Sequence, residues 1–382
     1  MWLAAVGGIS VAIWLYLLFA RGGFWRMREA QPEGTLPNPA PPVVAVIPAR
    51  NEAAVVAEAL ASLAAQRYPG AFRIVLADDD SDDGTGAIAQ AAAPPERLTV
   101  VRTSPLPKGW TGKLWAVSAG IDAALSYPAE YLLLTDADIV HPPDNLSALV
   151  ARAVSGPYDM VSYMAMLECR TLAEQALIPA FVFFFFMLYP PAWVKLTKPR
   201  GGRHGTAGAA GGCILIRRAA LERLGGIARI SGELIDDCAL AAAVQDSGGR
   251  VWLGLSTGTR SVRPYAGFGE IGRMISRTAF TQLRHSVWLL IGTVAGLAIT
   301  YLAPPLLTLL VPRGAAPGLG AIAWLSMSVA YYPALRYYRR PAFWAPLLPL
   351  VAGFYLAATV HSALAYWRGA GGLWKGRVQD AS

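Results

Sequence analysis

The sequence predicts an α/β protein in which a doubly wound, mostly parallel sheet is flanked by membrane-spanning helices. Two observations support this prediction. The middle of the chain alternates short apolar runs with helical stretches, as strand–helix–strand units do. The two ends are long apolar runs, and the 382 residues are 54% hydrophobic and only 15% charged. This composition excludes a disordered or fibrous protein and argues against a wholly soluble one.

Residues 1–22 are predicted to form an N-terminal transmembrane anchor. Residues 2–20 carry no charge and match the length of about 20 residues that a bilayer-spanning helix needs. No positive residue precedes this run and no small-residue cleavage pattern follows it, so we interpret it as uncleaved. Arg21, Arg26 and Arg28 follow at once, which places them in the cytoplasm by the positive-inside rule. The proline-rich residues 23–42 are expected to form a stiff linker.

Residues 43–262 carry the alternating pattern of the α/β domain. We expect strands at residues 43–47, 72–77, 98–102 and 131–135, and helices at residues 52–66, 84–93 and 113–126. The strand runs are short and apolar, and proline, glycine or polar residues bound them. In such a sheet, ligands bind beyond the carboxyl ends of the strands. The acidic residues of the chain fall at those positions.

The first acidic site is the run Asp78-Asp79-Asp80-Ser81-Asp82-Asp83, directly after a predicted strand. Five carboxylates in six positions repel one another, so the loop is either fully solvated or neutralised by a cation or by ligand donors. It is not a calcium loop of the EF-hand type, because the sixth position is Asp83 where glycine is needed and the twelfth is Ala89 where glutamate is needed. A solvated acidic turn is the simplest alternative.

The second acidic site is Asp136-Ala137-Asp138, again at a strand end. Carboxylates at positions i and i+2 can share a divalent ion if the backbone turns between them. Magnesium or manganese held by few carboxylates keeps open positions for a diphosphate. A surface turn is the alternative interpretation of so short a pattern.

The third acidic site is Asp236-Asp237, at the start of a predicted helix that runs to about Gln245. Acidic residues at a helix N-terminus are commonly explained by the helix dipole. The functional alternative is a general base whose pKa is raised by its neighbouring carboxylate and by partial burial. The spacing alone does not choose between them.

Taken in order, these sites resemble the family 2 glycosyltransferases, which have the GT-A fold, over about residues 43–285. Residues 78–85 are similar to the family's Asp-Asp-Gly-Ser-x-Asp-Gly-Thr loop, although Asp80 stands where glycine is usual. The other matching segments are residues 46–52 (opening strand and turn), 136–138 (Asp-x-Asp), and 211–218 with 225–226 (strand and helix before the base). Residues 236–240, which read Asp-Asp-Cys-Ala-Leu, stand where the family has Glu-Asp-x-Asp-Leu. The chain looks closest to the hopanoid-associated membrane glycosyltransferases, which are related to ceramide glucosyltransferases.

The resemblance implies a hexosyltransferase that moves a sugar from a nucleotide-diphosphate sugar to a lipid, possibly a hopanoid-related one, with inversion. It assigns the catalytic role to Asp237, beside Asp236, and a cofactor, Mg²⁺ or Mn²⁺, to Asp136 and Asp138. The donor site would comprise Pro48, Arg50, Glu52, Asp78, Asp79, Lys113, Asp136 and Arg284. Acceptor-only carboxylates such as Asp78 and Asp79 suit a nucleobase and ribose hydroxyls, whereas Lys113 and Arg284 suit the diphosphate.

Two segments indicate that the partners include a lipid acceptor and the lipid bilayer. Residues 263–286 are expected to form an interfacial amphipathic helix, because at about 100° per residue the basic and apolar residues separate. Arg273, Arg277 and Arg284 share one arc with Phe280, and Phe268, Ile271 and Ile275 lie opposite. Residues 178–189, with four consecutive phenylalanines, are too short to span a bilayer unaided. They form either a core helix or a segment beside a lipid entry groove.

Residues 287–366 are predicted to form a C-terminal transmembrane region, followed by a basic tail at residues 367–382. The region has three apolar runs, 287–311, 319–335 and 342–366. Prolines interrupt the last run, which is either one helix or a re-entrant hairpin, so the number of crossings stays open. We expect a multi-pass protein of the bacterial inner membrane with a cytoplasmic catalytic domain.

Charge and the numbers of cysteines and histidines exclude some classes of partner and metal site. The net charge of +8 favours anionic partners such as phospholipids or phosphorylated ligands, and nucleic acid is not expected. Three cysteines and four scattered histidines form neither a disulfide framework nor a zinc pattern. Only Arg284 matches the Gln/Arg-x-x-Arg-Trp motif of related enzymes. A processive polysaccharide synthase and a catalytically inactive scaffold of the same fold are the alternatives to a lipid glycosyltransferase.

Overall fold

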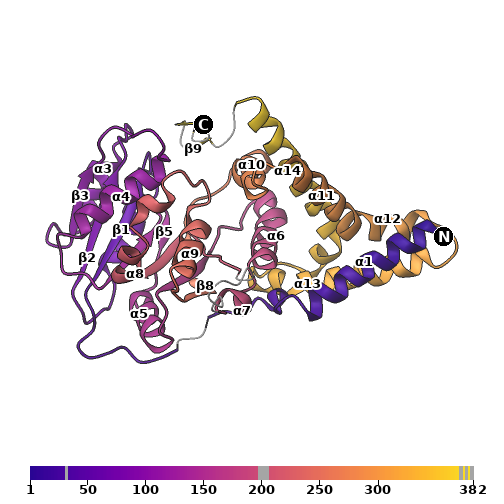
Figure 1. Cartoon of the computed structure of the whole chain (residues 1–382), viewed down its shortest axis with the longest axis horizontal. Coiled ribbons are helices and arrows are strands. Elements are labelled where there is room, and N and C mark those ends of the chain that lie inside the picture. The colour runs from indigo at the N-terminus through magenta and orange to yellow at the C-terminus, as the bar shows by residue number, and fades with distance from the viewer. Residues whose placement is uncertain (31–32, 197–205, 370–372, 375–376, 379–382) are drawn as a thin grey trace.

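The computed structural model describes residues 1–30, 33–196, 206–369, 373–374 and 377–378. These residues form an elongated molecule with an α/β domain at one end and a set of long helices at the other (Figure 1). Residues 31–32 of the predicted linker, residues 197–205 of the predicted α/β domain and part of the predicted basic tail lie outside the described residues. The predicted fold class, an α/β sheet domain flanked by apolar helices, is confirmed.

An eight-stranded mixed sheet lies at the centre of the α/β domain, in the order β3-β2-β1-β4-β7-β6-β8-β5. The strands are β1 (Val43–Ala49), β2 (Phe72–Asp78), β3 (Leu98–Arg102), β4 (Tyr131–Thr135), β5 (Ile139–Val140), β6 (Met160–Met166), β7 (Cys213–Arg217) and β8 (Val251–Ser261). Strands β1 to β4 are parallel to one another. Strand β7 is antiparallel to both of its neighbours, which makes the sheet mixed.

The four predicted strands are present. Strand β1 ends at Ala49, two residues beyond its predicted end, and it includes Pro48. The strand can contain this proline because its pairing with β4 already stops at Val46. Proline lacks an N–H group and is tolerated where no ladder bond is required on that side. The predicted helix at residues 52–66 begins later, at Val56, after a turn that brings Glu52 to the edge of the sheet.

Helices cover both faces of the sheet, and alternate residues of β1 belong to separate cores. Val44 and Val46 pack in the cluster that contains α4, whereas Ala45 and Ile47 pack in the cluster that contains α2 and α5. The helices of this domain are α2 (Val56–Ala64), α3 (Thr85–Ala92), α4 (Gly112–Ala124), α5 (Asn145–Ser155), α8 (Arg218–Arg223) and α9 (Asp236–Asp246). Burial on both faces explains why the strands read as continuous apolar runs.

The segment after the first helix packs on the rest of the protein. Phe24, in a short 3₁₀ turn (η1, Phe24–Arg26), is buried, and its ring centroid lies 5.2 Å from that of Phe183. The backbone N–H of Ala30 donates to the carbonyl of Leu255 in β8 at 2.8 Å. These residues are therefore docked onto the α/β domain and do not stand off it as a spacer.

In the described part of the chain, five helical segments are long and apolar enough to cross a membrane: Trp2–Phe19, Leu172–Val194, Val287–Leu310, Ala316–Tyr337 and Ala342–Trp367. They comprise α1 (Trp2–Phe19), α6 (Leu172–Leu188), α7 (Pro191–Val194), α11 (Val287–Leu297), η3 (Ala298–Leu302), α12 (Ala303–Leu310), α13 (Ala316–Tyr337), η4 (Ala342–Leu347) and α14 (Leu348–Trp367). The last segment is one continuous helix, so a re-entrant hairpin is wrong. Pro349 lies in the first turn of α14, where no backbone N–H is needed.

Helix α6 lies between the α/β domain and the long helices (Figure 1). Phe183 and Phe186 are fully buried, and the Phe183 ring also contacts Tyr331 of α13. Phe184 packs edge-on against Tyr355 of α14. The run of phenylalanines therefore faces protein on most of its sides, and the structure favours a core helix over a segment immersed in lipid.

Helix α1 supplies hydrogen-bond donors to backbone carbonyls of the apolar segment Val287–Leu310. In that part of the segment, prolines lack the N–H groups that would otherwise bond these carbonyls. Pro304 has no N–H to donate to the Thr300 carbonyl four residues earlier, and this carbonyl instead accepts from Nε1 of the buried Trp14 at 2.9 Å. The hydroxyl of Ser10 donates to the carbonyl of Ile299 at 2.7 Å. In a lipid environment such carbonyls must find a protein donor.

We therefore expect Trp14→Phe to lower the free energy of unfolding by about 2 kcal/mol, because it leaves a buried carbonyl without a partner and opens a small cavity. Thermal unfolding of detergent-solubilised protein would show a lower midpoint. Trp2→Phe is the matched control, because Trp2 is 72% exposed. Equal midpoints for the two variants would contradict the role of Trp14.

Helix α10 (Phe268–Gln282) is amphipathic, as its spacing predicts. Ile271 and Ile275 are buried, and the ring of Phe268 lies 6.1 Å from that of Phe354 in α14. Phe280, which falls on the basic arc, is only 1% exposed because it packs against Tyr366. The apolar face of α10 is therefore covered largely by α14.

Candidate active site

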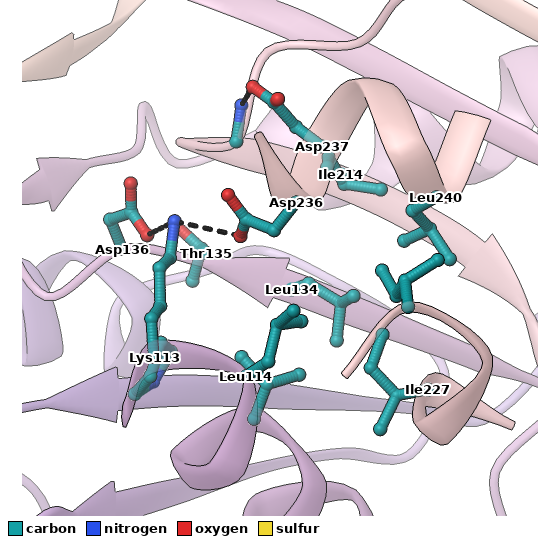
Figure 2. Close-up of a pocket in the computed structure, with 14 residues that line it drawn as sticks. Lys113, Leu114, Leu134, Thr135, Asp136, Ile214, Ile227, Asp236, Asp237 and Leu240 are labelled. Carbon is teal, nitrogen blue, oxygen red and sulfur yellow. Dashed lines mark hydrogen bonds and ion pairs between the residues drawn. The ribbon is translucent and has the colours of Figure 1, made fainter. Parts of the chain in front are cut away.

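A pocket opens at the carboxyl ends of β1 and β4, between α4 and α9 (Figure 2). Its empty volume, including the open mouth, is about 350 Å³. Five of the residues that the sequence predicts for the site line it: Pro48, Lys113, Asp136, Asp236 and Asp237. They come from segments separated by up to about half of the chain, and the sheet brings them to one edge.

Lys113 lies at the centre of the pocket and contacts two carboxylates. Its Nζ atom is 3.0 Å from Oδ1 of Asp136 and 3.1 Å from Oδ2 of Asp236 (Figure 2). Burial lowers the pKa of Lys113, but the charges of Asp136, Asp236 and Asp237 outweigh this effect and raise the pKa, so that the lysine stays charged. One cation against three carboxylates leaves an excess of negative charge in this part of the site.

Asp237 is held at the first turn of α9 by two backbone donors. The N–H of Gly211 donates to its Oδ2 at 2.8 Å, and the N–H of Cys238 donates to its Oδ1 at 2.7 Å. Burial raises the pKa of Asp237 to about 6; Asp236 raises it as well, whereas Lys113 and the two N–H groups lower it. A carboxylate with this pKa is ionised at neutral pH and is basic enough to accept a proton.

Asp136 and Asp138 follow β4, and each has one carboxylate oxygen paired with a basic side chain. Lys113 pairs with Asp136, and Arg263 pairs with Asp138. Burial raises the pKa of Asp136, Lys113 lowers it, and the nearby Asp138 raises it further. Oδ2 of Asp138 accepts from the Ser261 hydroxyl at 2.8 Å and from Nε of Arg263 at 3.1 Å. The two carboxylates therefore lie near each other at the end of β4, although only Asp136 lines the pocket.

Arg263 is a site residue that the sequence analysis missed. Its guanidinium bridges Asp138 and Glu52, with Nη2 at 2.6 Å from Oε2 of Glu52. The two carboxylates raise the pKa of Arg263 although burial lowers it, so the side chain is permanently charged. Arg263 lies two residues after the end of β8, and no local feature of the sequence marks it as a site residue.

The acidic loop after β2 is folded by internal donors, and its first two carboxylates are buried. Oδ1 of Asp79 accepts from the Thr103 hydroxyl at 3.0 Å, and Oδ2 lies 3.4 Å from Nη1 of Arg50. Oδ1 of Asp78 accepts from the N–H of Ser81 at 3.1 Å. A solvated acidic turn is therefore wrong for Asp78 and Asp79, whose exposures are 3% and 1%.

Asp80 occupies the position where the resemblance leads one to expect glycine. Its φ angle is 55°, in the left-handed region that glycine adopts without strain and that aspartate tolerates better than most residues. The loop therefore keeps the backbone shape that glycine would allow.

Arg284 does not line the pocket in this structure. It is exposed just beyond α10, and its role in donor binding stays a prediction. Another residue of α10 contacts the segment after α6: Nε2 of Gln282 donates to the hydroxyl of Tyr189 at 2.7 Å. The Tyr189 ring packs on Gly208, where a Cβ atom would come within 2.6 Å of it.

Two carboxylates fit a divalent ion that also binds a diphosphate. Magnesium is usually held by one or two carboxylates together with waters and substrate phosphates. Oδ2 of Asp136 and Oδ1 of Asp138 take no part in the ion pairs described above. Within the described ranges, no group of three or more His, Cys, Asp or Glu side chains is arranged to hold a metal. The residues present therefore fit an open, two-carboxylate site.

Residues 44–225, which form most of the α/β domain, match the family model described as Glycosyl transferase family 2. The domain belongs to this family. The prediction of a family 2 glycosyltransferase domain is confirmed, whereas a special closeness to the hopanoid-associated enzymes stays a prediction.

Curated relatives match this chain over part of its length and part of theirs. The chain is 35% identical over 127 residues to an undecaprenyl-phosphate 4-deoxy-4-formamido-L-arabinose transferase of Pseudomonas paraeruginosa, which covers 33% of this chain and 36% of the relative. It is 36% identical over 115 residues to an N-acetylglucosaminyltransferase of Rhizobium leguminosarum bv. viciae, or 29% of this chain and 25% of the relative. The chain thus spans about a third of the first relative and a quarter of the second.

A solved structure resembles this chain over nearly its whole length. It is the mannosyltransferase from Pyrobaculum calidifontis in complex with GDP-Man and Mn²⁺, with a TM-score of 0.57 and 20% identity. The alignment covers 95% of this chain and 99% of that one. This likeness shows the fold, and it confirms the predicted GT-A domain.

We expect Arg263→Gln to weaken Mn²⁺ binding about tenfold, because residues that orient metal ligands commonly contribute that much. Loss of the guanidinium would free Asp138 to rotate and would leave Glu52 without this partner. Isothermal titration calorimetry with Mn²⁺ measures the effect. Arg260→Gln is the control, because Arg260 pairs with the exposed Glu58 at 3.5 Å outside the pocket. Unchanged Mn²⁺ affinity in Arg263→Gln would contradict this role.

Proposed function

We propose that this protein is a metal-dependent, inverting glycosyltransferase of the membrane that moves a sugar from a nucleotide-diphosphate sugar to a lipid. One observation carries the proposal: Asp136, Asp236, Asp237 and Lys113 converge on one pocket at the carboxyl edge of a family 2 domain. An inactive scaffold of the same fold would have no need to keep a buried, charged cluster of this kind, which is costly to desolvate.

Groups in the pocket and beside it, at the same edge of the sheet, suit a nucleoside diphosphate. Asp79, held by Thr103 and Arg50, offers acceptor oxygens to the N–H groups of a base or to ribose hydroxyls. Lys113 can shift from its carboxylate partners to the diphosphate oxygens. Asp136 and Asp138 would hold Mg²⁺ or Mn²⁺, which would supply positive charge to the leaving diphosphate. The similar mannosyltransferase of P. calidifontis was solved with GDP-Man and Mn²⁺.

The acceptor half of the pocket contains the base. The acceptor hydroxyl transfers its proton to Asp237 as its oxygen forms a bond to the anomeric carbon, and the bond from that carbon to the diphosphate breaks on the opposite side. A single displacement of this kind inverts the anomeric carbon. Lys113 offsets the charge that develops on the leaving group. The raised pKa of Asp237, about 6, suits proton transfer near neutral pH.

The apolar helices support a position of this chemistry at a membrane. Five described segments are long and apolar enough to cross a bilayer, and the one that contains α6 lies between the α/β domain and the other long helices (Figure 1). A relative over part of the domain is named as a transferase to undecaprenyl phosphate, which supports a lipid acceptor. Arg21, Arg26 and Arg28 after α1 support a cytoplasmic position of the domain in a multi-pass protein of the bacterial inner membrane.

A direct transfer assay tests the proposal. Purified protein in lipid nanodiscs is incubated with Mn²⁺, a panel of nucleotide sugars and separate acceptor fractions: hopanoid lipids, polyprenyl phosphates and membrane phospholipids. Mass spectrometry should show one lipid class heavier by one sugar, and NMR should show an anomeric configuration opposite to that of the donor. A polymeric product would favour a processive synthase. Donor binding without transfer to any fraction would favour an inactive scaffold.

A further inference from the structure

A chain of buried polar side chains lies directly behind the pocket. The Thr259 hydroxyl is 3.0 Å from Oδ1 of Asn145, and Nδ2 of Asn145 is 2.9 Å from Nδ1 of His141. Nε2 of His141 is 3.0 Å from the Thr135 hydroxyl, which is 2.8 Å from the carbonyl of Gly212. Each of these four side chains is less than 5% exposed. They come from β8, α5, the segment after β5 and β4, so the chain crosses the sheet.

The hydrogen bonds in this chain have a direction that the chemistry of its members fixes. Oδ1 of Asn145 accepts from Thr259, so its amide nitrogen donates to His141, whose Nδ1 must then be unprotonated. The ring carries its proton on Nε2 and donates it to Thr135, which leaves the Thr135 hydroxyl proton for the carbonyl of Gly212. The reverse direction would turn the Thr135 proton towards His141 and leave Gly212 without this donor.

A neutral imidazole is consistent with this arrangement. Burial lowers the pKa of His141 to about 4, so the ring is uncharged at physiological pH. A single tautomer can therefore persist throughout the range in which the enzyme would operate.

The Thr135 end of this series of hydrogen bonds links the two sides of the pocket. Thr135 directly precedes Asp136, the carboxylate that contacts Lys113. Gly212 directly follows Gly211, whose N–H holds the carboxylate of Asp237. The bond between Thr135 and Gly212 thus ties the donor side of the pocket to the cradle of the base.

We propose that His141 is a positioning residue: as the Nε2–H tautomer, oriented by Asn145 and Thr259, it holds the Thr135 hydroxyl on Gly212 and so fixes the spacing between Asp136 and Asp237. The proposal rests on the function proposed above. It predicts that reversing the tautomer, without touching any pocket residue, disturbs both metal binding and turnover.

The tautomer is measured first, in unmodified protein. The chain has four histidines, so ¹⁵N-histidine labelling gives few signals, and substituting the other three assigns that of His141. We expect a protonated Nε2 and an unprotonated Nδ1. A protonated Nδ1 would overturn the proposal, whether or not any sugar transfer is found. An inactive enzyme with the expected tautomer would instead count against the proposed function alone.

Thr259→Val then removes the group that orients Asn145. We expect signal from protonated Nδ1 to appear, and we expect kcat and Mn²⁺ affinity each to fall about tenfold, because small displacements of catalytic groups have effects of this size. Thr259→Ser, which keeps the hydroxyl, should restore all three readouts. Thr99→Val is the matched control, because the Thr99 hydroxyl bonds Tyr127 at 2.9 Å on the edge strand β3.

A second variant changes the tautomer of His141 by a substitution in α5 instead of β8. Asn145→Asp places an acceptor-only side chain at Nδ1 of His141 and should protonate that nitrogen. This variant replaces Thr259→Val if Thr259→Val fails to fold. It also tests whether Thr259→Val acts by displacing Ser261, two residues away in β8, because Asn145→Asp leaves β8 unchanged. A changed tautomer with unchanged kcat and unchanged Mn²⁺ affinity overturns the proposal. If Thr99→Val loses as much kcat and Mn²⁺ affinity as Thr259→Val, the proposal is overturned as well.

Discussion

Asp237→Asn should lower kcat about 10³-fold while nucleotide-sugar binding survives, because an amide cannot accept the acceptor's proton and general bases contribute about this much. Asparagine has nearly the same shape, so Gly211 keeps its place beside α9. The variant leaves the ion pairs of Lys113 with Asp136 and Asp236 in place. Mass-spectrometric rates and calorimetric donor affinities separate the two effects.

The control for this variant is Asp122→Asn, because Asp122 is exposed on α4 outside the pocket. It should leave both the rate and the affinity unchanged. The assignment of the base fails if Asp237→Asn turns over near the normal rate. Loss of donor binding in Asp237→Asn would instead place this residue in the donor site.

The pKa of Asp237 also predicts a pH profile. Since only the ionised carboxylate accepts a proton, kcat/KM should rise about tenfold per pH unit below pH 6 and level off above it. Stability has the opposite sign. The folded-state pKa lies above the unfolded value of about 4, so the folded protein binds more protons between these values and loses stability as pH rises towards 6. Asp237→Asn should therefore raise the thermal midpoint at pH 7 but not at pH 4.

The first half of the sheet was predictable because its strands are continuous apolar runs. Tyr131–Thr135 and Leu98–Arg102 have the bounds that the sequence pattern gives. The second half was harder to predict. Strand β8 ends in the polar residues of positions 256–261, and these are held by pairing with β6 and β5, which are distant in sequence. A local pattern does not reveal such pairing, because its stabilising contacts are not local.

The site shows the same division between local and long-range information. The three acidic motifs could be found because each follows a strand or opens a helix. Arg263 could not be found, because its partners Asp138 and Glu52 lie 125 and 211 residues away in the chain. The solvation of the acidic loop was undecidable for the same reason, since Thr103 and Arg50, which hold Asp79, come from other segments.

Asp138→Ala should abolish the increase in donor affinity that Mn²⁺ produces, because it removes one of the two carboxylates proposed to hold the ion. We expect Mn²⁺ affinity to fall by about a hundredfold or more, beyond the loss expected for residues that only orient ligands. Titrations of nucleotide sugar with and without Mn²⁺ would then coincide. Asp144→Ala is the control: Asp144 is exposed, pairs with Arg67 at 2.5 Å and lies outside the pocket.

The metal-free titration is essential to this experiment, because the variant also changes Arg263. Without Asp138, the guanidinium keeps Glu52 as a partner but carries less compensated positive charge. It could attract the diphosphate directly and raise donor affinity in the absence of metal. Asp138→Asn separates the two effects, since its amide oxygen can still accept from Arg263 while its charge is gone. If Mn²⁺ still strengthens donor binding in both variants, Asp138 is not a metal ligand, and the ion would have to be held elsewhere.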